Sequence, residues 1–307
     1  MGLSTVNAFK HIHSSEDGII VLSGEQLRQL QRVLNGMLAD VDACCRRHGL
    51  QYVLGGGSCL GAVRHHGFIP WDDDIDINMP RADYLQFIAQ FREEYGDRYW
   101  IHTPQETTGY GLTLSRVLLK GTCVRTREDF HNHDECGAFI DIFVIENTYD
   151  NPVRRRLHGL GCMAMGLIQS CSKFWRDRKE LTALAQAIED PEERKSVLRT
   201  FRIKIALGTL TAFRSTDAWT KATDRMYARC RESDSRYVTI PSGKGHFFGE
   251  LYLREQLLPG IPVDYDGSQR PVPPDCDGYL RRLYGDYRKL PTEEQKESHI
   301  FFAPFQL

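Results

Sequence analysis

The sequence predicts an α+β protein with a helical insert. Strand-like apolar runs recur in the first half of the chain, at 51–58, 71–78, 111–126 and 137–147. Amphipathic helical patterns flank these runs at 23–49 and 81–96, and a longer helical pattern covers 151–232. A chain of 307 residues has ample material for a buried core.

The charge of the chain is unevenly distributed. The net formal charge is −2 with a pI near 6.6, which gives no support to nucleic-acid binding. Residues 154–231 hold 17 Lys+Arg and 8 Asp+Glu, a net of +9, which leaves 22 and 33, a net of −11, for the rest. Nine cysteines without a C-x-x-C pair, no apolar signal region and no bilayer-length apolar run lead us to expect a reduced, cytoplasmic protein.

The first helix is expected at residues 23–49. Its apolar residues recur on one helix face, at Leu27, Leu30, Val33, Leu34, Leu38 and Val41. Ser23 and Gln26 have the spacing of a capping box, and Gly49 is a suitable C-terminal stop. The short buried strand that follows runs into a glycine-rich turn that ends at Ser58.

The acidic run WDDDIDIN, residues 71–78, is the segment most informative about function. In a strand, successive side chains point to opposite faces, so Asp72, Asp74 and Asp76 would share one face and Asp73 would lie on the other. Like charges this close raise one another's pKa unless a cation neutralises them. Hard carboxylate oxygens suit Mg²⁺ or Mn²⁺, and we therefore predict a divalent metal here.

Two further strand-like runs follow a helix that Pro80 opens. The first turns at Lys120-Gly121, which predicts a hairpin. The second, at 137–147, carries Asp141 within an otherwise apolar strand. A lone strand acid often simply faces solvent. If the sheet places this strand beside the first acidic strand, however, Asp141 would complete the metal site.

The helical stretch from Asn151 to about Glu232 is basic, with breaks at Pro191 and around Thr216. Apolar faces flanked by Arg and Lys are typical of helices that lie on anionic lipid. Solvated helices packed on a core show the same pattern, so both interpretations stay open. We expect four parts in the chain: an extension at 1–22, a catalytic core at 23–150, the helical insert at 151–232, and a part at 233–307 that completes the active-site cleft and closes with a helix-like pattern over 279–299.

The glycine-rich turn predicts a phosphate site. Backbone N–H groups at Gly56 and Gly57 and the hydroxyl of Ser58 can donate to phosphate oxygens. The turn lacks the lysine of a P-loop and the last glycine of a dinucleotide-binding fingerprint. A metal on the nearby aspartates would bridge oxygens of a phosphate held here, which predicts phosphoryl or nucleotidyl transfer. Arg64 could contact the phosphate or pair with an aspartate, and both alternatives stay open.

The segment GGGSCLGAVRHHGFIPWDDDIDINMPRADY resembles the signature of the LicD family, a branch of the nucleotidyltransferase-fold superfamily that includes the fukutin-related proteins. The later FIDIFVIE is similar to that family's second acidic strand, and GYLRRLYGDYRKLPTEEQKESH is similar to its C-terminal segment. The resemblance covers residues 25–149 and 237–300 and leaves the basic helical insert unmatched.

The resemblance implies a small mixed sheet flanked by helices. It also implies transfer of a phospho-alcohol group, such as phosphocholine, from a CDP-alcohol to a hydroxyl of a cell-surface glycan, with release of CMP. The metal, Mg²⁺ or Mn²⁺, would be bound by Asp74, Asp76 and Asp141, and Asp72 would be a further catalytic acid; either Asp72 or Asp141 could take the acceptor proton. The expected substrate-binding residues are Gly56, Gly57, Ser58, Arg64, Arg116 and His299.

Two other functions fit the same residues. A nucleotidyltransferase would move an NMP group and release pyrophosphate, and a nucleotide-binding or membrane-surface scaffold would bind without turnover. For the phospho-alcohol transferase we expect a CDP-alcohol donor and a glycan or lipid-linked glycan acceptor as partners, and no nucleic acid. Residues 154–231 would give it a peripheral contact with the inner face of an anionic membrane.

Overall fold

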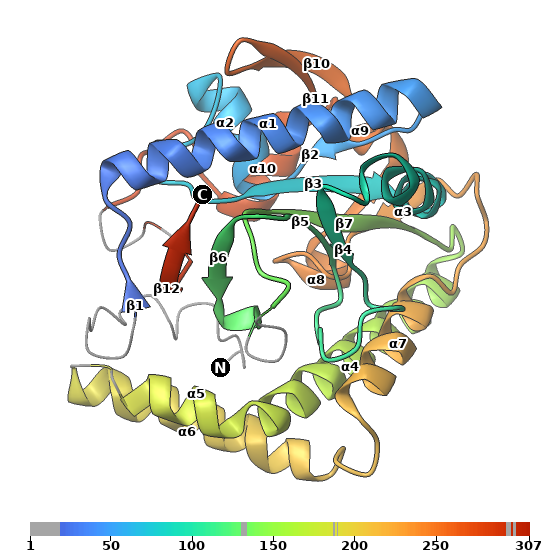
Figure 1. The fold of residues 1–307 in the computed structure, drawn as a ribbon. Helices are drawn as coiled ribbons and strands as arrows, with labels where there is room; N and C mark the ends of the chain where they lie inside the picture. Colours follow the sequence, from blue (N-terminus) through green and yellow to red (C-terminus); the bar gives the residue numbers. More distant parts are fainter. Residues whose placement is uncertain (1–18, 130–133, 187, 189, 293–295, 297–298) are drawn as a thin grey trace.

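A computed structural model describes residues 19–129, 134–186, 188, 190–292, 296 and 299–307. A curled mixed sheet lies at the centre, α1 and α3 lie over it, and α4 to α7 form a helical layer along one edge (Figure 1). This arrangement confirms the α+β class.

The helices are α1 (Gly24–His48), α2 (Gly56–His65), α3 (Arg81–Tyr95), α4 (Pro152–Arg176), α5 (Arg178–Gln186), α6 (Pro191–Thr209), α7 (Thr216–Tyr227), α8 (His246–Gly249), α9 (Arg254–Leu257), α10 (Cys276–Tyr284) and the 3₁₀ turn η3 (Arg127–Asp129). The strands are β1 (Ile19–Ile20), β2 (Val53–Leu54), β3 (Ile75–Pro80), β4 (Tyr99–His102), β5 (Ser115–Leu119), β6 (Cys123–Thr126), β7 (Phe139–Thr148), β8 (Tyr237–Thr239), β9 (Leu251–Leu253), β10 (Ile261–Tyr265), β11 (Ser268–Val272) and β12 (Phe301–Gln306).

The central sheet has the strand order β2-β3-β7-β5-β4, and β8 and β9 extend it from the far end of β7. Strands β3 and β7 are parallel, whereas β5 is antiparallel to β7 and to β4. A second sheet has the order β1-β12-β6, and β10 and β11 form a hairpin. The two strands that the sequence marked as acidic are therefore direct neighbours.

Local sequence signals predicted several boundaries correctly. Helix α1 begins after Ser23, whose side chain forms the capping box with Gln26, and it ends at Gly49 in the left-handed conformation. Helix α6 begins at Pro191, and α7 begins after its N-cap Ser215. The predicted helical nature of the insert is thus confirmed.

Three predictions about local structure are wrong. Residues around Lys120-Gly121 form no hairpin, because β4 and β7 occupy both edges of β5 and β6 pairs with β12 instead. The acidic strand begins only at Ile75, so Asp72 to Asp74 precede it. The last predicted helix ends at Tyr284, where Gly285 takes a positive φ of 67°, rather than continuing over the helix-like pattern.

The helical layer has a small core of its own and a polar connection to the sheet. Its apolar cluster comprises Phe174, Leu181, Leu184, Ala185, Ile188, Val197 and Phe201. The connection is made by Arg81 at the start of α3, which donates to Glu146 on β7 and, at 2.8 Å, to Asp224 on α7. Among the described residues, no helix is both long enough and apolar enough to cross a membrane.

Candidate active site

Three carboxylates meet where β3 and β7 run side by side. The parallel register places Asp76 opposite Asp141, and Asp74 lies immediately before β3. Each of the three offers an oxygen within 4.8 Å of the others. The topology that the metal prediction required is therefore present, and metal binding itself stays a prediction.

Asp72 and Asp73 precede β3, so strand alternation does not decide where their side chains lie. Asp72 lies outside the strand, yet a Cβ added at Gly57 would come within 2.8 Å of its Oδ2. Asp73, predicted to face away, is buried, and its carboxylate accepts hydrogen bonds from the backbone N–H of His299 at 2.7 Å and from its Nδ1 at 2.8 Å. The Nδ1 of His299 also lies 3.8 Å from Asp74 Oδ2.

The glycine-rich segment is the first turn of helix α2 rather than a loop. Gly56 has a positive φ of 41°, and a Cβ there would collide with Asp76 Oδ2. The N–H of Gly55 donates to the carbonyl of Asp76, and the N–H of Asp76 donates to Ser58 Oγ, both at 2.9 Å. The absence of side chains thus lets the positive end of α2 lie directly against the carboxylates.

This packing changes how we interpret Ser58 and Arg64. Ser58 is buried, and its hydroxyl accepts a hydrogen bond from the backbone of the acidic strand. The structure therefore assigns it a role in positioning that strand. Arg64 donates through Nη1 to the carbonyl of Tyr287 at 2.7 Å and through Nε to His65 at 3.0 Å. Its guanidinium thus holds the C-terminal segment rather than one of the described aspartates, and contact with a phosphate stays a prediction.

Arg116 forms a buried pair with Asp141. Its Nε and Nη2 donate to the two carboxylate oxygens at 2.6 and 3.0 Å, and its guanidinium lies 3.8 Å from the centre of the Phe139 ring. The third nitrogen, Nη1, is buried and has no hydrogen-bond partner within the part of the chain that the structure describes. A buried donor of this kind usually has a partner, and a bound anion would supply one.

The electrostatics of the site favour binding of a cation. Burial, reinforced by the neighbouring aspartates, raises the pKa of Asp72 and of Asp76 well above the usual range. Burial raises the pKa of Asp74 to about 6 even though His299 opposes the shift. Burial alone would lower the pKa of His299, but the charge and hydrogen bond of Asp73 raise it to about 10. Added positive charge would relieve this crowding of carboxylates.

One contributor, Tyr279 of α10, gave no separate signal in the sequence. Its buried hydroxyl accepts from the N–H of Gly56 at 3.0 Å and from Asn78 Nδ2 at 3.1 Å. It therefore ties the start of α2 to β3 from a position more than two hundred residues away along the chain. Only the resemblance of the segment around it to a family motif pointed to this region.

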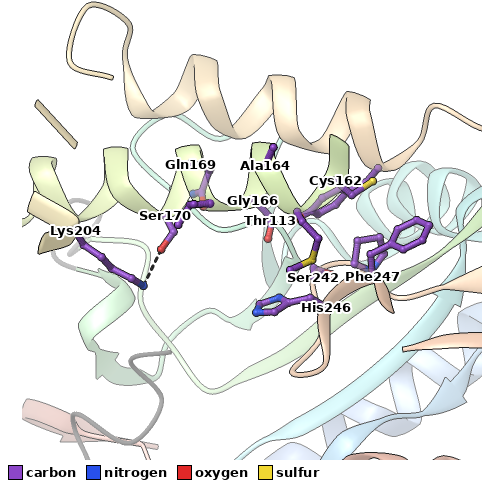
Figure 2. A pocket seen from close by; sticks show the side chains of 14 residues that line it. Thr113, Cys162, Ala164, Gly166, Gln169, Ser170, Lys204, Ser242, His246 and Phe247 are labelled. Carbon is purple, nitrogen blue, oxygen red and sulfur yellow. Dashed lines mark hydrogen bonds between the residues drawn. The ribbon is translucent and has the colours of Figure 1, made fainter. Parts of the chain in front are cut away.

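A separate cavity of about 480 Å³ lies beneath α4. Figure 2 shows Lys204 hydrogen-bonded to Ser170 at one end and Ser242, His246 and Phe247 at the other. None of the predicted site residues lines it. The cavity is therefore distinct from the carboxylate cluster.

The fold and the site define a class of protein: an α+β chain with carboxylates on two parallel neighbouring strands, faced by a glycine-rich helix start. Residues 49–154 match the family model described as LicD/FKTN/FKRP, nucleotidyltransferase domain. The chain thus contains a LicD-family domain, which includes all of the sheet from β2 to β7.

Similarity to one curated protein extends over nearly the whole chain. The lipopolysaccharide cholinephosphotransferase LicD of Haemophilus influenzae is 27% identical over 283 residues, which cover 89% of this chain and 95% of that protein. The uncharacterized protein RP689 of Rickettsia prowazekii is 28% identical over 143 residues, 43% of this chain and 47% of its own length. The similarity to the first relative includes the helical layer, which the family model leaves out.

Proposed function

We propose that the protein transfers a phospho-alcohol group of the phosphocholine type from a CDP-alcohol to a glycan hydroxyl, with release of CMP. The observation that carries this proposal is the cluster of Asp74, Asp76 and Asp141 within a LicD-family domain. The name of the Haemophilus relative supports phosphocholine as the group and a lipopolysaccharide-like glycan as the acceptor. A nucleotide donor fits a cytoplasmic location.

The donor atoms of the site fit a divalent metal. Three carboxylates within 4.8 Å of one another offer hard oxygen ligands, and burial, together with the neighbouring aspartates, raises the pKa of Asp74 and Asp76. Mg²⁺ or Mn²⁺ held by Asp74, Asp76 and Asp141 would offset the charge of the donor diphosphate and of the departing CMP.

The residues around the cluster can bind, orient and deprotonate the substrates. The acceptor oxygen forms a bond to the distal phosphorus of the donor, and the bond from that phosphorus to the bridging oxygen breaks, so that CMP leaves with this oxygen. We assign the acceptor proton to Asp72, because Arg116 already engages both oxygens of Asp141. Arg116 Nη1 and the N–H groups of Gly57 and Ser58 in the first turn of α2 are the donors we assign to the diphosphate, since the N–H of Gly56 already donates to Tyr279.

Product analysis tests the proposal. The full-length protein is incubated with Mg²⁺ or Mn²⁺, a lipopolysaccharide preparation and CDP-choline, CDP-glycerol or CDP-ribitol, and released CMP is measured. Asp76→Asn should lower the rate at least about a thousandfold, since it removes the negative charge of a proposed metal ligand beside the reacting phosphate. Asp97→Asn, on an exposed turn, is the matched control and should leave the rate unchanged.

Three outcomes would contradict the proposal. Pyrophosphate released from a nucleoside triphosphate, without CMP from any CDP-alcohol, would indicate a nucleotidyltransferase. Nucleotide binding by calorimetry without turnover would indicate a scaffold. Full activity of Asp76→Asn, or activity that survives removal of metal by EDTA, would exclude the metal-dependent mechanism.

A further inference from the structure

The helical layer exposes an unusual number of large apolar side chains. Among the described residues, fourteen large apolar side chains are exposed, and nine of them belong to α4, α6 and the turn after α6. They are Val153, Leu157, Leu160, Met163, Leu167, Ile203, Leu207, Leu210 and Phe213, and we call this set the α4–α6 surface. Leu210 is 72% and Phe213 81% exposed. Scattered exposed apolar residues are ordinary, but this degree of clustering marks an interaction site.

The exposed apolar residues of α4 lie on the helix face that α6 covers in the C-terminal half of α4. Helix α6 packs on the C-terminal half of α4, where Gly208 lies against the backbone of Cys171, and it ends at Thr209. Leu160 and Val153 precede Cys171 by three and five full helical turns, so they lie on the same face of α4. The face that is buried near Cys171 is therefore bare over the N-terminal half of the helix.

The α6 part lies on the outer side of the layer. Phe201 and Gly208 contact α4, whereas Ile203, Leu207 and Leu210 recur at one-turn spacing on the exposed side. Figure 1 shows α6 along the edge of the molecule farthest from α1 and the central sheet. Both parts of the surface thus face outward from the same helical layer.

The helical stretches that carry this surface are rich in cationic side chains. The stretches 151–176 and 194–216 contain 11 Lys+Arg and no Asp or Glu. Arg156, Arg199 and Arg202 are exposed beside the apolar side chains. A neighbouring acid, Glu232, lies 3.4 Å from Arg154 at the very start of α4. Such a combination of apolar and mainly cationic side chains complements a surface that is both apolar and anionic.

We propose that the α4–α6 surface docks the protein on an anionic lipid membrane. Its apolar side chains would enter the boundary between head groups and acyl chains, and its arginines would bind lipid phosphates. Met163 and Leu167 also line the cavity beneath α4, so this cavity opens beside the docked membrane. The inference does not depend on the transferase activity, because it uses none of the carboxylate residues.

Vesicle co-sedimentation of the full-length protein tests the docking. The vesicles contain either phosphatidylcholine alone or an equal mixture of phosphatidylcholine and phosphatidylglycerol. We expect binding to the anionic vesicles that exceeds binding to the neutral ones at least about tenfold and that weakens as salt is added. Absence of binding to the anionic vesicles at low salt would overturn the proposal.

Two sets of substitutions separate the apolar and cationic contributions. The variant Leu157→Ser/Leu160→Ser/Leu210→Ser/Phe213→Ser should lose at least about tenfold in binding. The variant Arg156→Gln/Arg199→Gln/Arg202→Gln should lose a similar factor and much of the salt dependence. The matched control Leu85→Ser/Ile261→Ser changes exposed apolar residues outside the layer and should bind as wild type.

Two further measurements distinguish a membrane from a second copy of the chain, and docking from catalysis. Light scattering should show the same oligomeric state for the wild type and the four-serine variant. A dimer that this variant dissociates would show that a second copy covers the surface, and the membrane proposal would be wrong. CMP release from soluble CDP-choline should be unchanged in all three variants, so failure of docking and failure of the proposed enzyme are distinguishable.

Discussion

The central sheet buries charges, whereas the helical layer exposes apolar side chains. Asp73, Arg116 and Asp141 are 5% or less exposed, while Leu210 and Phe213 are more than 70% exposed. Both patterns oppose the usual distribution, in which charged groups face water and apolar groups fill the core. A buried charge needs a partner inside the protein, and an apolar patch needs one outside it. The contrast is consistent with a site for charged ligands at the sheet and with the surface partner that we propose for the helical layer.

Arg81, Glu146 and Asp224 form an ion triad between the sheet and the helical layer. Loss of this triad gives the largest effect on stability that we expect. Arg81→Met would leave the carboxylates of Glu146 and Asp224 buried next to each other without their shared cation. Loss of one partner from a buried ion pair costs about 3–5 kcal/mol, and we expect that loss in the free energy of unfolding. Urea denaturation followed by circular dichroism measures it.

Arg92→Met is the matched control for this substitution. Arg92 lies on the same helix and pairs with Glu106 at 2.5 Å, but both side chains are about half exposed. Its removal should leave the urea midpoint nearly unchanged. Equal effects of the two substitutions would show that apolar contacts, rather than the triad, hold the helical layer on the sheet.

The close approach of α2 to the aspartates gives the second prediction. Gly57→Ala would place a Cβ 2.8 Å from Asp72 Oδ2, so the carboxylate or the helix must move. Because displacements of this size at a reacting centre cost about a hundredfold in rate, we expect CMP release to fall by about that factor in a folded protein. Steady-state kinetics with CDP-choline measures the change.

Gly36→Ala controls for the general effect of adding a methyl group to a helix. Gly36 lies within α1, and nothing lies within 4 Å of an added Cβ. Alanine should therefore stabilise the protein by up to about 1 kcal/mol without altering the rate. If Gly57→Ala behaved in the same way, contact between α2 and Asp72 would not matter for the reaction.

Prediction from the sequence succeeded for contacts between residues close in the chain and failed for contacts between residues far apart. The capping of α1 and the acid on β7 depend on neighbouring residues and on strand alternation, which are visible in the sequence. The pairing of His299 with Asp73 joins residues 226 positions apart, and no local pattern predicts it. The hairpin expected at Gly121 was wrong for this reason, since the choice of strand partners depends on the whole sheet.

The helical layer shows a further limit. Periodicity identified amphipathic helices there, but an apolar stripe has the same appearance whether a neighbour covers it or not. On α4 one face is covered near Cys171 and bare at Leu160, and the difference depends only on where α6 ends. The sequence thus predicts the stripe, and the packing shows which part of it is available to a partner.

The smallest predicted effect concerns a buried charge outside the carboxylate cluster. Glu250 is 2% exposed, and its Oε1 accepts a hydrogen bond from the N–H of Gly245 at 2.9 Å. Burial raises the pKa of its carboxyl from the usual 4.5 to about 7. The folded protein then holds this proton more tightly than the unfolded chain, so stability falls as the pH rises through this interval and stays lower above it. Glu250→Gln keeps the acceptor oxygen and removes the titration.

The Gln variant should therefore be about 1–3 kcal/mol more stable than the wild type at pH 8 and nearly equal to it close to pH 4.5, by urea denaturation across this range. Glu255→Gln, an exposed change on α9, should follow the wild-type curve throughout. If Glu250→Gln also followed that curve, Glu250 would be ionised in the folded protein at neutral pH. Burial near the sheet would then be insufficient to raise the pKa of a carboxyl. The raised pKa values in the carboxylate cluster would need another cause.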